Sequence, residues 1–166
     1  FFVNDGKVNN SSNIQLGIIQ VNTSTGTDIL NGYPELCIVP VPGSCSKYYI
    51  IGAYPFSTGN MPGANPQLGY AEIDMSLYNT QSSAYGVLTG ADQFGYVTAT
   101  DIPNDLSGTW VNHDDHCSEM HLAVSQPLSE GNRILFISSC GELFTSEISA
   151  QGIGTAPAPE DENTEF

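Results

Sequence analysis

Short runs of β-branched and aromatic residues, separated by tight-turn signals, recur along almost the whole chain. Turns are marked by groups such as Asn4-Asp5-Gly6 and Pro42-Gly43-Ser44. No stretch repeats apolar residues at helical spacing for more than about two turns. Antiparallel strands can be joined by such tight turns, whereas parallel neighbours need long, usually helical crossovers. The pattern predicts an all-β fold of antiparallel strands at residues 1–4, 16–22, 36–41, 48–54, 69–77, 86–88, 96–100, 121–125, 133–138 and 142–149.

Two segments follow the same order of strand, turn, strand, loop and strand. They cover residues 35–77 and 119–149. A single meander cannot bury both of its faces, so neighbouring copies must cover one another. We therefore predict that residues 1–151 form β-propeller blades, as a partial propeller, with a β-sandwich as the alternative.

The composition changes after residue 151. Residues 152–166 contain a Thr-Ala-Pro-Ala-Pro stretch followed by several acidic residues, and such a segment buries too little apolar surface to offset the entropy of ordering. We expect an acidic linker or disordered tail there. Because the sequence opens at Phe1 inside a predicted strand and has no signal-peptide pattern, we also expect a processed or excised piece of a longer precursor.

The charge of the chain is strongly one-sided. Eighteen acidic residues and three basic ones give a formal net charge of -15, which repels phosphate backbones and anionic lipid. Nucleic-acid partners are therefore not expected, and the absence of an apolar run of about 18 residues argues against membrane insertion. The acidity indicates either solubility in salty surroundings or capture of Ca²⁺, and the lack of a D-x-[DN]-x-[DN]-G loop favours solubility.

An even number of cysteines in a Lys-poor chain is typical of an oxidising compartment. The predicted hairpin of residues 121–138 brings Cys117 and Cys140 to its open end, so we expect a disulfide there. A second bridge between Cys37 and Cys45 requires Cys45 to curl back within its loop. The other connectivities of the four cysteines stay open.

One stretch of the sequence resembles a known family. It consists of the segment Ile38-Val39-Pro40-Val41-Pro42-Gly43-Ser44-Cys45-Ser46-Lys47-Tyr48-Tyr49-Ile50-Ile51, preceded by Phe2-Val3-Asn4-Asp5-Gly6 and followed by Tyr70-Ala71-Glu72-Ile73-Asp74-Met75-Ser76. These residues resemble propeller-type regions of secreted Bacteroidota proteins, which usually carry a C-terminal domain for type IX secretion, as in gliding-motility-associated proteins. The resemblance covers about residues 1–77 and implies a propeller fold and a secreted or cell-surface location.

The chain departs from this family pattern in two ways. It contains no sorting domain, and its length supplies three or four blades where closed propellers usually have four to eight. Excision from a longer protein or self-association would account for the deficit. The resemblance supplies no substrate and no catalytic residue.

All three histidines lie within residues 113–121. His113, His116 and His121, with Asp115 or Cys117, offer ligands suited to Zn²⁺ or Cu²⁺. The alternative is an ordinary polar loop in which Cys117 is tied into a disulfide. A Ser/His/Asp triad can also be drawn from this segment, but no G-x-S-x-G elbow accompanies it.

Aromatic residues in or beside the predicted loops are candidates for stacking against a sugar ligand. We take Tyr54 and Trp110 as ligand-binding candidates, and the same argument applies to Tyr33, Phe56, Tyr78, Tyr85 and Phe94. The alternative is that these rings pack onto blade edges. Glu72 and Asp74 share one face of a strand, about 7 Å apart, where solvation at a blade edge explains them as well as catalysis does.

Taken together, the residues predict a secreted or cell-surface binding or assembly module rather than an enzyme. Its ligand would be a protein, a glycan, another copy of the chain or the rest of a longer precursor. One alternative is a metal-binding protein or metal-dependent hydrolase centred on the histidine cluster, with Zn²⁺, Cu²⁺ or Ca²⁺ as candidate metals. Another is a structural subunit of an extracellular filament, in which an open strand edge at residues 1–4 pairs with another chain.

Overall fold

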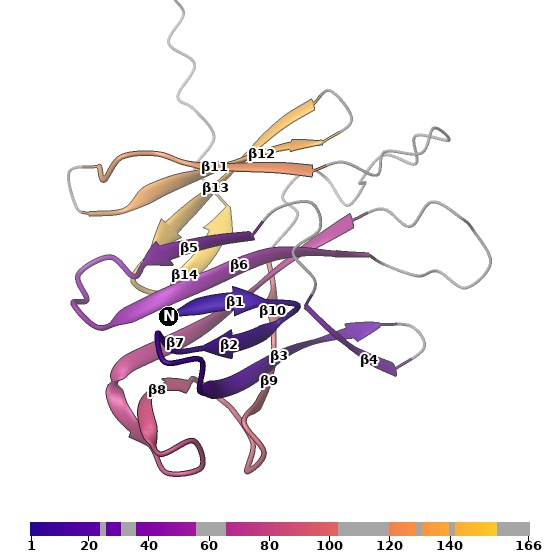
Figure 1. Ribbon diagram of the computed structural model, residues 1–166. Helices are drawn as coiled ribbons and strands as arrows, with labels where there is room; N and C mark the ends of the chain where they lie inside the picture. Colours follow the sequence, from indigo (N-terminus) through magenta and orange to yellow (C-terminus); the bar gives the residue numbers. More distant parts are fainter. Residues whose placement is uncertain are drawn as a thin grey trace, which may run out of the picture.

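The computed structural model describes residues 1–23, 26–30, 36–55, 66–102, 120–128, 131–139 and 142–155. Fourteen β-strands and their turns make up these ranges, which contain no helix and hence none that could cross a membrane. The strands form three sheets (Figure 1). The prediction of an all-β fold with antiparallel sheets is confirmed.

The N-terminal sheet has the strand order β1-β2-β3-β4 and consists of β1 (Phe2–Asn4), β2 (Lys7–Asn9), β3 (Gln15–Thr23), β4 (Gly26–Ile29) and β9 (Tyr96–Thr98). The turn between β1 and β2 has Asp5 and Gly6 at φ 47° and 68°. A two-residue hairpin turn needs positive φ at both positions if it is to match the right-handed twist of the strands that it joins.

The middle sheet has the order β10-β7-β6-β5, and β8 also pairs with β7. Its strands are β5 (Leu36–Pro40), β6 (Lys47–Pro55), β7 (Pro66–Asn79), β8 (Ala84–Leu88) and β10 (Thr100–Asp101). The C-terminal sheet is a four-stranded meander of β11 (Met120–Val124), β12 (Arg133–Ser139), β13 (Glu142–Ser149) and β14 (Gly152–Thr155). In both segments expected to repeat, consecutive strands pair antiparallel.

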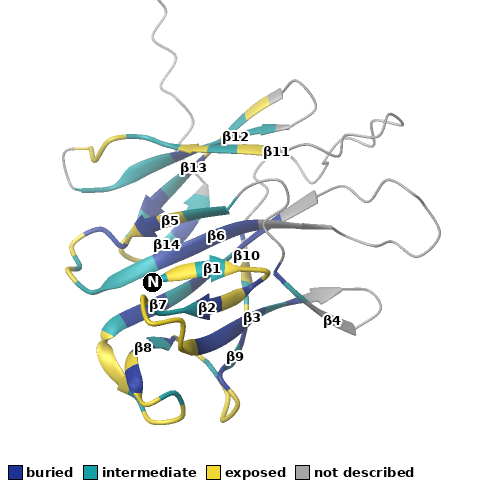
Figure 2. Cartoon of the chain, in the orientation of Figure 1, coloured by how far each residue is buried: buried dark blue, intermediate teal, exposed yellow. Residues whose placement is uncertain are grey.

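The middle sheet is packed on both faces. Successive residues of a strand point to opposite faces: Ile50 packs with the N-terminal sheet, whereas Tyr49 and Ile51 pack with the C-terminal sheet. Figure 2 shows the resulting band of buried residues in β6. Burial on both faces explains why β6 reads as a nearly continuous apolar run instead of alternating with polar residues.

Two buried clusters therefore separate the three layers. The first joins the N-terminal and middle sheets and contains Val8, Leu16, Ile19, Val21, Leu30, Val97, Ile50, Ala71, Ile73, Ala84 and Leu88. The second joins the middle and C-terminal sheets and contains Val39, Val41, Tyr49, Ile51, Leu68, Ile102, Leu135, Ile137, Ile148 and Ile153.

Two features correct the sequence-based expectations. Residues 152–155 form strand β14 and do not belong to a disordered tail. Ile153 in this strand is 4% exposed and is part of the core between the middle and C-terminal sheets. In addition, β9 pairs with β3 in parallel, with Ile19 opposite Val97. The connection between these two strands is long enough for parallel pairing because it passes through the middle sheet, so no helix is needed.

Candidate functional site

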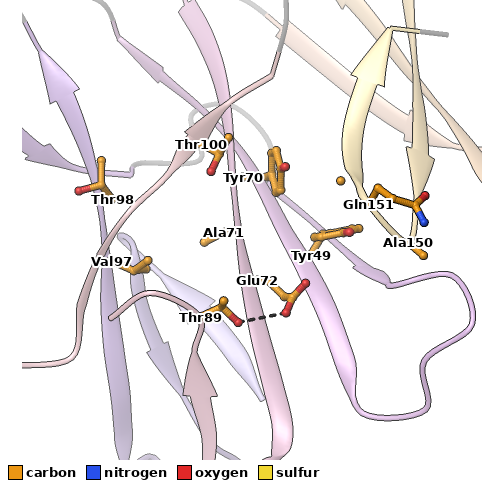
Figure 3. A pocket seen from close by; sticks show the side chains of 11 residues that line it. Tyr49, Tyr70, Ala71, Glu72, Thr89, Val97, Thr98, Thr100, Ala150 and Gln151 are labelled. Atoms are coloured by element: carbon orange, nitrogen blue, oxygen red, sulfur yellow. Dashed lines mark hydrogen bonds between the residues drawn. The ribbon is translucent and has the colours of Figure 1, made fainter. Parts of the chain in front are cut away.

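A cavity of about 210 Å³ opens where the three sheets meet, and we call it the junction pocket. Strand β9 supplies residues from the N-terminal sheet, β6 and β7 from the middle sheet, and the β13–β14 turn from the C-terminal sheet (Figure 3). Its lining consists of Tyr49, Tyr70, Ala71, Glu72, Thr89, Val97, Thr98, Thr100, Ala150, Gln151 and Gly152.

Two tyrosines form one wall of the junction pocket. The rings of Tyr49 and Tyr70 meet edge to face, with centroids 5.3 Å apart and an interplanar angle of 83°. Tyr49 is 2% exposed, and its hydroxyl donates a 3.0 Å hydrogen bond to the carbonyl oxygen of Ser149. Burial raises the pKa of Tyr49 to about 12, so this hydroxyl remains a hydrogen-bond donor throughout the physiological range.

Glu72 is the carboxylate of the junction pocket. Its Oε1 accepts a 2.9 Å hydrogen bond from Lys47 Nζ and a 3.0 Å bond from Thr89 Oγ1. The bond to Glu72 raises the pKa of Lys47. Because the side chain of Lys47 is 42% exposed, the ion pair is screened by solvent and orients the carboxylate more than it stabilises the fold.

Asp74, two residues further along β7, is committed to different partners. Its Oδ1 accepts hydrogen bonds from the backbone nitrogen of Ser76 at 2.9 Å and from Ser76 Oγ at 2.7 Å. The side-chain bond from Ser76 is the main reason that the pKa of Asp74 is lowered. Glu72 and Asp74 thus have different hydrogen-bond donors, although the charge of Lys47 acts on both carboxylates.

The junction pocket offers groups for binding a small polar molecule. Thr89, Thr98 and Thr100 bring hydroxyls, Gln151 brings an amide, and Glu72 Oε1 is already paired with a lysine. The described lining contains neither a histidine nor a cysteine, and the hydroxyl of Thr89 donates a hydrogen bond to Glu72. Hydrogen bonding is therefore the chemistry that this set of residues supports.

The residues predicted to bind metal are only partly within the described chain. His121 lies in β11 opposite Ser138 and is exposed. His113, His116 and Asp115 lie outside the described residues, and the metal site stays a prediction. Within the ranges that the structure covers, no group of three potential metal ligands occurs.

The aromatic residues predicted to bind a ligand are also only partly within the described chain. Tyr54 lies in β6 opposite Gln67, but the description does not extend to its side chain, and Trp110 lies outside the described residues. Sequence reasoning did not select Tyr49, Thr89 or Gln151 for the junction pocket. These residues come together through the packing of the three sheets, and no pattern in the sequence indicates it.

The two cysteines within the described ranges, Cys37 and Cys45, are not joined by a disulfide. Cys37 is the second residue of β5 and pairs opposite Ile51, whereas Cys45 lies beyond the other end of that strand, in the connection to β6. The extended chain from Cys37 to Val41, at the start of the turn that holds Cys45, spans about 13 Å. A disulfide needs Cα atoms within about 7 Å of each other. The second predicted bridge is therefore absent. Cys117 and Cys140 lie outside the described residues.

Comparisons with protein-family models, with curated proteins and with solved structures found no match to this chain.

Proposed function

We propose that the chain is an extracellular or cell-surface binding and assembly module without catalytic activity, built from consecutive blades of a propeller-like fold. The observation that carries the proposal is the stack of three sheets, in which the middle sheet is covered on both faces by its neighbours. A sheet that also carries apolar side chains on its outer face is stabilised by a partner that covers this face. The two end sheets are thus the places where assembly would continue.

The first strands of adjacent sheets support the propeller arrangement. Strands β5 and β11, each at the edge of its sheet, line one groove of about 310 Å³ together with Arg133. In a propeller, one edge strand of every blade faces the central channel. Two neighbouring edge strands that converge on a shared groove fit this geometry.

An extracellular location rests on the sequence. The chain is acidic and poor in lysine, contains four cysteines, and resembles propeller-type regions of secreted Bacteroidota proteins. A binding module on a cell surface exposes its connecting turns and pockets to ligands, while the sheets supply a rigid support. The junction pocket, with its hydroxyls and amide, is a site of this kind.

The outer face of the C-terminal sheet is the proposed surface for assembly. Ile134 and Phe136 alternate with Leu135 and Ile137, which are buried against the middle sheet, so the first two side chains point outward. Leu143 lies on the same outer face and is 67% exposed. A partly apolar sheet face with an exposed leucine is what a further sheet of the stack would bury.

Sedimentation velocity over a wide concentration range tests the proposal. We expect the wild-type chain to associate as concentration rises and Leu143→Lys to weaken this association, because the substitution places a charge on the surface that must become buried. Leu128→Lys is the matched control, since Leu128 is 49% exposed in the turn after β11 and undergoes the same change of charge.

Two results would count against the proposal. One is a wild-type chain that stays monomeric at every concentration, and the other is association that both lysine variants weaken equally. Growth into open-ended polymers instead of a closed oligomer would support the related function of a filament subunit, since head-to-tail contacts that do not close generate fibres.

A further inference from the structure

The hairpin formed by β7 and β8 carries two tyrosines that the core does not use. Tyr78 and Tyr85 lie directly opposite each other in the register of the two strands. Their rings meet edge to face, with centroids 5.5 Å apart and an interplanar angle of 78°. They are 53% and 61% exposed, in contrast to the buried Tyr49. Figure 2 shows this end of β7 and the turn before β8 as largely exposed.

The turn of this hairpin is fixed by its own hydrogen bonds. Asn79 Oδ1 accepts from the backbone nitrogens of Gln81 and Ser82 at 3.0 and 3.2 Å. Asn79 Nδ2 donates to the carbonyl oxygen of Leu16 at 2.9 Å, which ties the hairpin to the N-terminal sheet. The tyrosine pair is therefore held in place before any ligand arrives, and this lowers the entropy lost on binding.

The tip of this hairpin is also uncharged in a chain of net charge -15. Residues 75–91 contain no Asp, Glu, Lys, Arg or His. The other exposed positions at this end of the hairpin are Ser76, Leu77, Thr80, Gln81 and Ser83, which offer hydroxyls, an amide and one apolar side chain. A surface of tyrosine, serine and amide side chains, depleted of charge, has the composition of binding loops rather than of a merely solvated turn.

We propose that this hairpin binds a neutral oligosaccharide, with Tyr78 and Tyr85 as the stacking residues. The negative face of an aromatic ring attracts the C–H groups of a sugar ring, and neighbouring hydroxyls and amides satisfy the sugar hydroxyls. The overall negative charge disfavours anionic polysaccharides. This inference rests on the proposed function, for which it names a class of ligand.

Titration of the ¹⁵N-labelled chain with neutral hexasaccharides of glucose, mannose and xylose, followed by amide chemical shifts, tests the proposal. We expect saturable shifts confined to the hairpin and its surroundings for at least one of these sugars. Tyr85→Ala and Tyr78→Ala should each weaken that binding about tenfold, whereas Tyr85→Phe should retain most of it because the ring remains. Phe2→Ala, which removes a 42% exposed ring from another sheet, is the matched control.

Several outcomes would overturn the inference. They are the absence of shifts with every neutral sugar, binding that neither alanine variant weakens, and stronger binding of a hexagalacturonate of the same length. A change in oligomeric state on Tyr85→Ala would show that the hairpin contacts a protein instead. None of these results depends on Leu143, so failure of sugar binding can be told apart from failure of the proposed assembly.

Discussion

Single residues in this protein carry distinct physical roles even where the sequence repeats one residue type. Tyr49 and Tyr78 lie in neighbouring strands of the same sheet, yet the first is almost fully buried and the second is more than half exposed. The difference arises because Tyr49 faces the C-terminal sheet, whereas Tyr78 lies past the end of the packed region of β7, where the register shifts before β8. The environment of each side chain therefore decides between core packing and exposure to solvent.

Asp74 makes the stability of the fold sensitive to acid. Since its pKa in the folded state is lowered below 3.8, its contribution is present above that pH and is lost as the pH falls below it. We expect Asp74→Asn to flatten the dependence of unfolding free energy on pH in the acid range, measured by urea unfolding. Asp5→Asn, in the β1–β2 turn, removes an equal charge and is the control. An unchanged slope in Asp74→Asn would contradict this expectation.

At the scale of elements, strand β14 closes the core of the C-terminal sheet. Its residue Ile153 pairs opposite Ile148 and packs against the middle sheet. Truncation after Gln151 should therefore lower the free energy of unfolding by on the order of 3 kcal/mol, the usual loss for a buried isoleucine. Truncation after Thr155 removes the acidic end of the chain and should cost little. Equal stability of the two truncated chains in chemical denaturation would refute the structural role of β14.

The sequence identifies the longer strands and two of the short ones, β1 and β9. Runs such as Tyr48–Ile51 indicate a strand because β-branched and aromatic residues fit a pleated sheet buried on both faces. Strands β2, β4 and β14 are not predicted, because their three or four residues lack the run of β-branched and aromatic residues that marks the others. The junction pocket could not be predicted at all, since it depends on how three sheets pack. Tyr78 and Tyr85 were suggested as loop aromatics, and only the structure showed them as a pair.

On the scale of the whole molecule, the net charge of -15 acts against compactness. Acidic side chains repel one another over distances comparable to the Debye length, about 10 Å at 0.1 M salt. We therefore expect the melting temperature to rise as sodium chloride increases from low to moderate concentration, measured by differential scanning fluorimetry. Sodium sulfate is excluded from this comparison because it also strengthens hydrophobic burial. A melting temperature that falls with sodium chloride would show that ion pairs outweigh the repulsion.

The parallel pairing of β3 with β9 joins the beginning and the end of the segment formed by residues 1–102. The backbone nitrogen of Ile18 donates a hydrogen bond to Gly95, and that of Ala99 donates to Gln20, after the chain has passed through strands β5 to β8 of the middle sheet. A recombination or fusion point placed between β4 and β5 would thus leave the first sheet without its last strand. By contrast, residues 120–155 form a sheet that is continuous in sequence. In evolution, such a molecule can exchange its third layer as a single gene segment, while the first two must be inherited together.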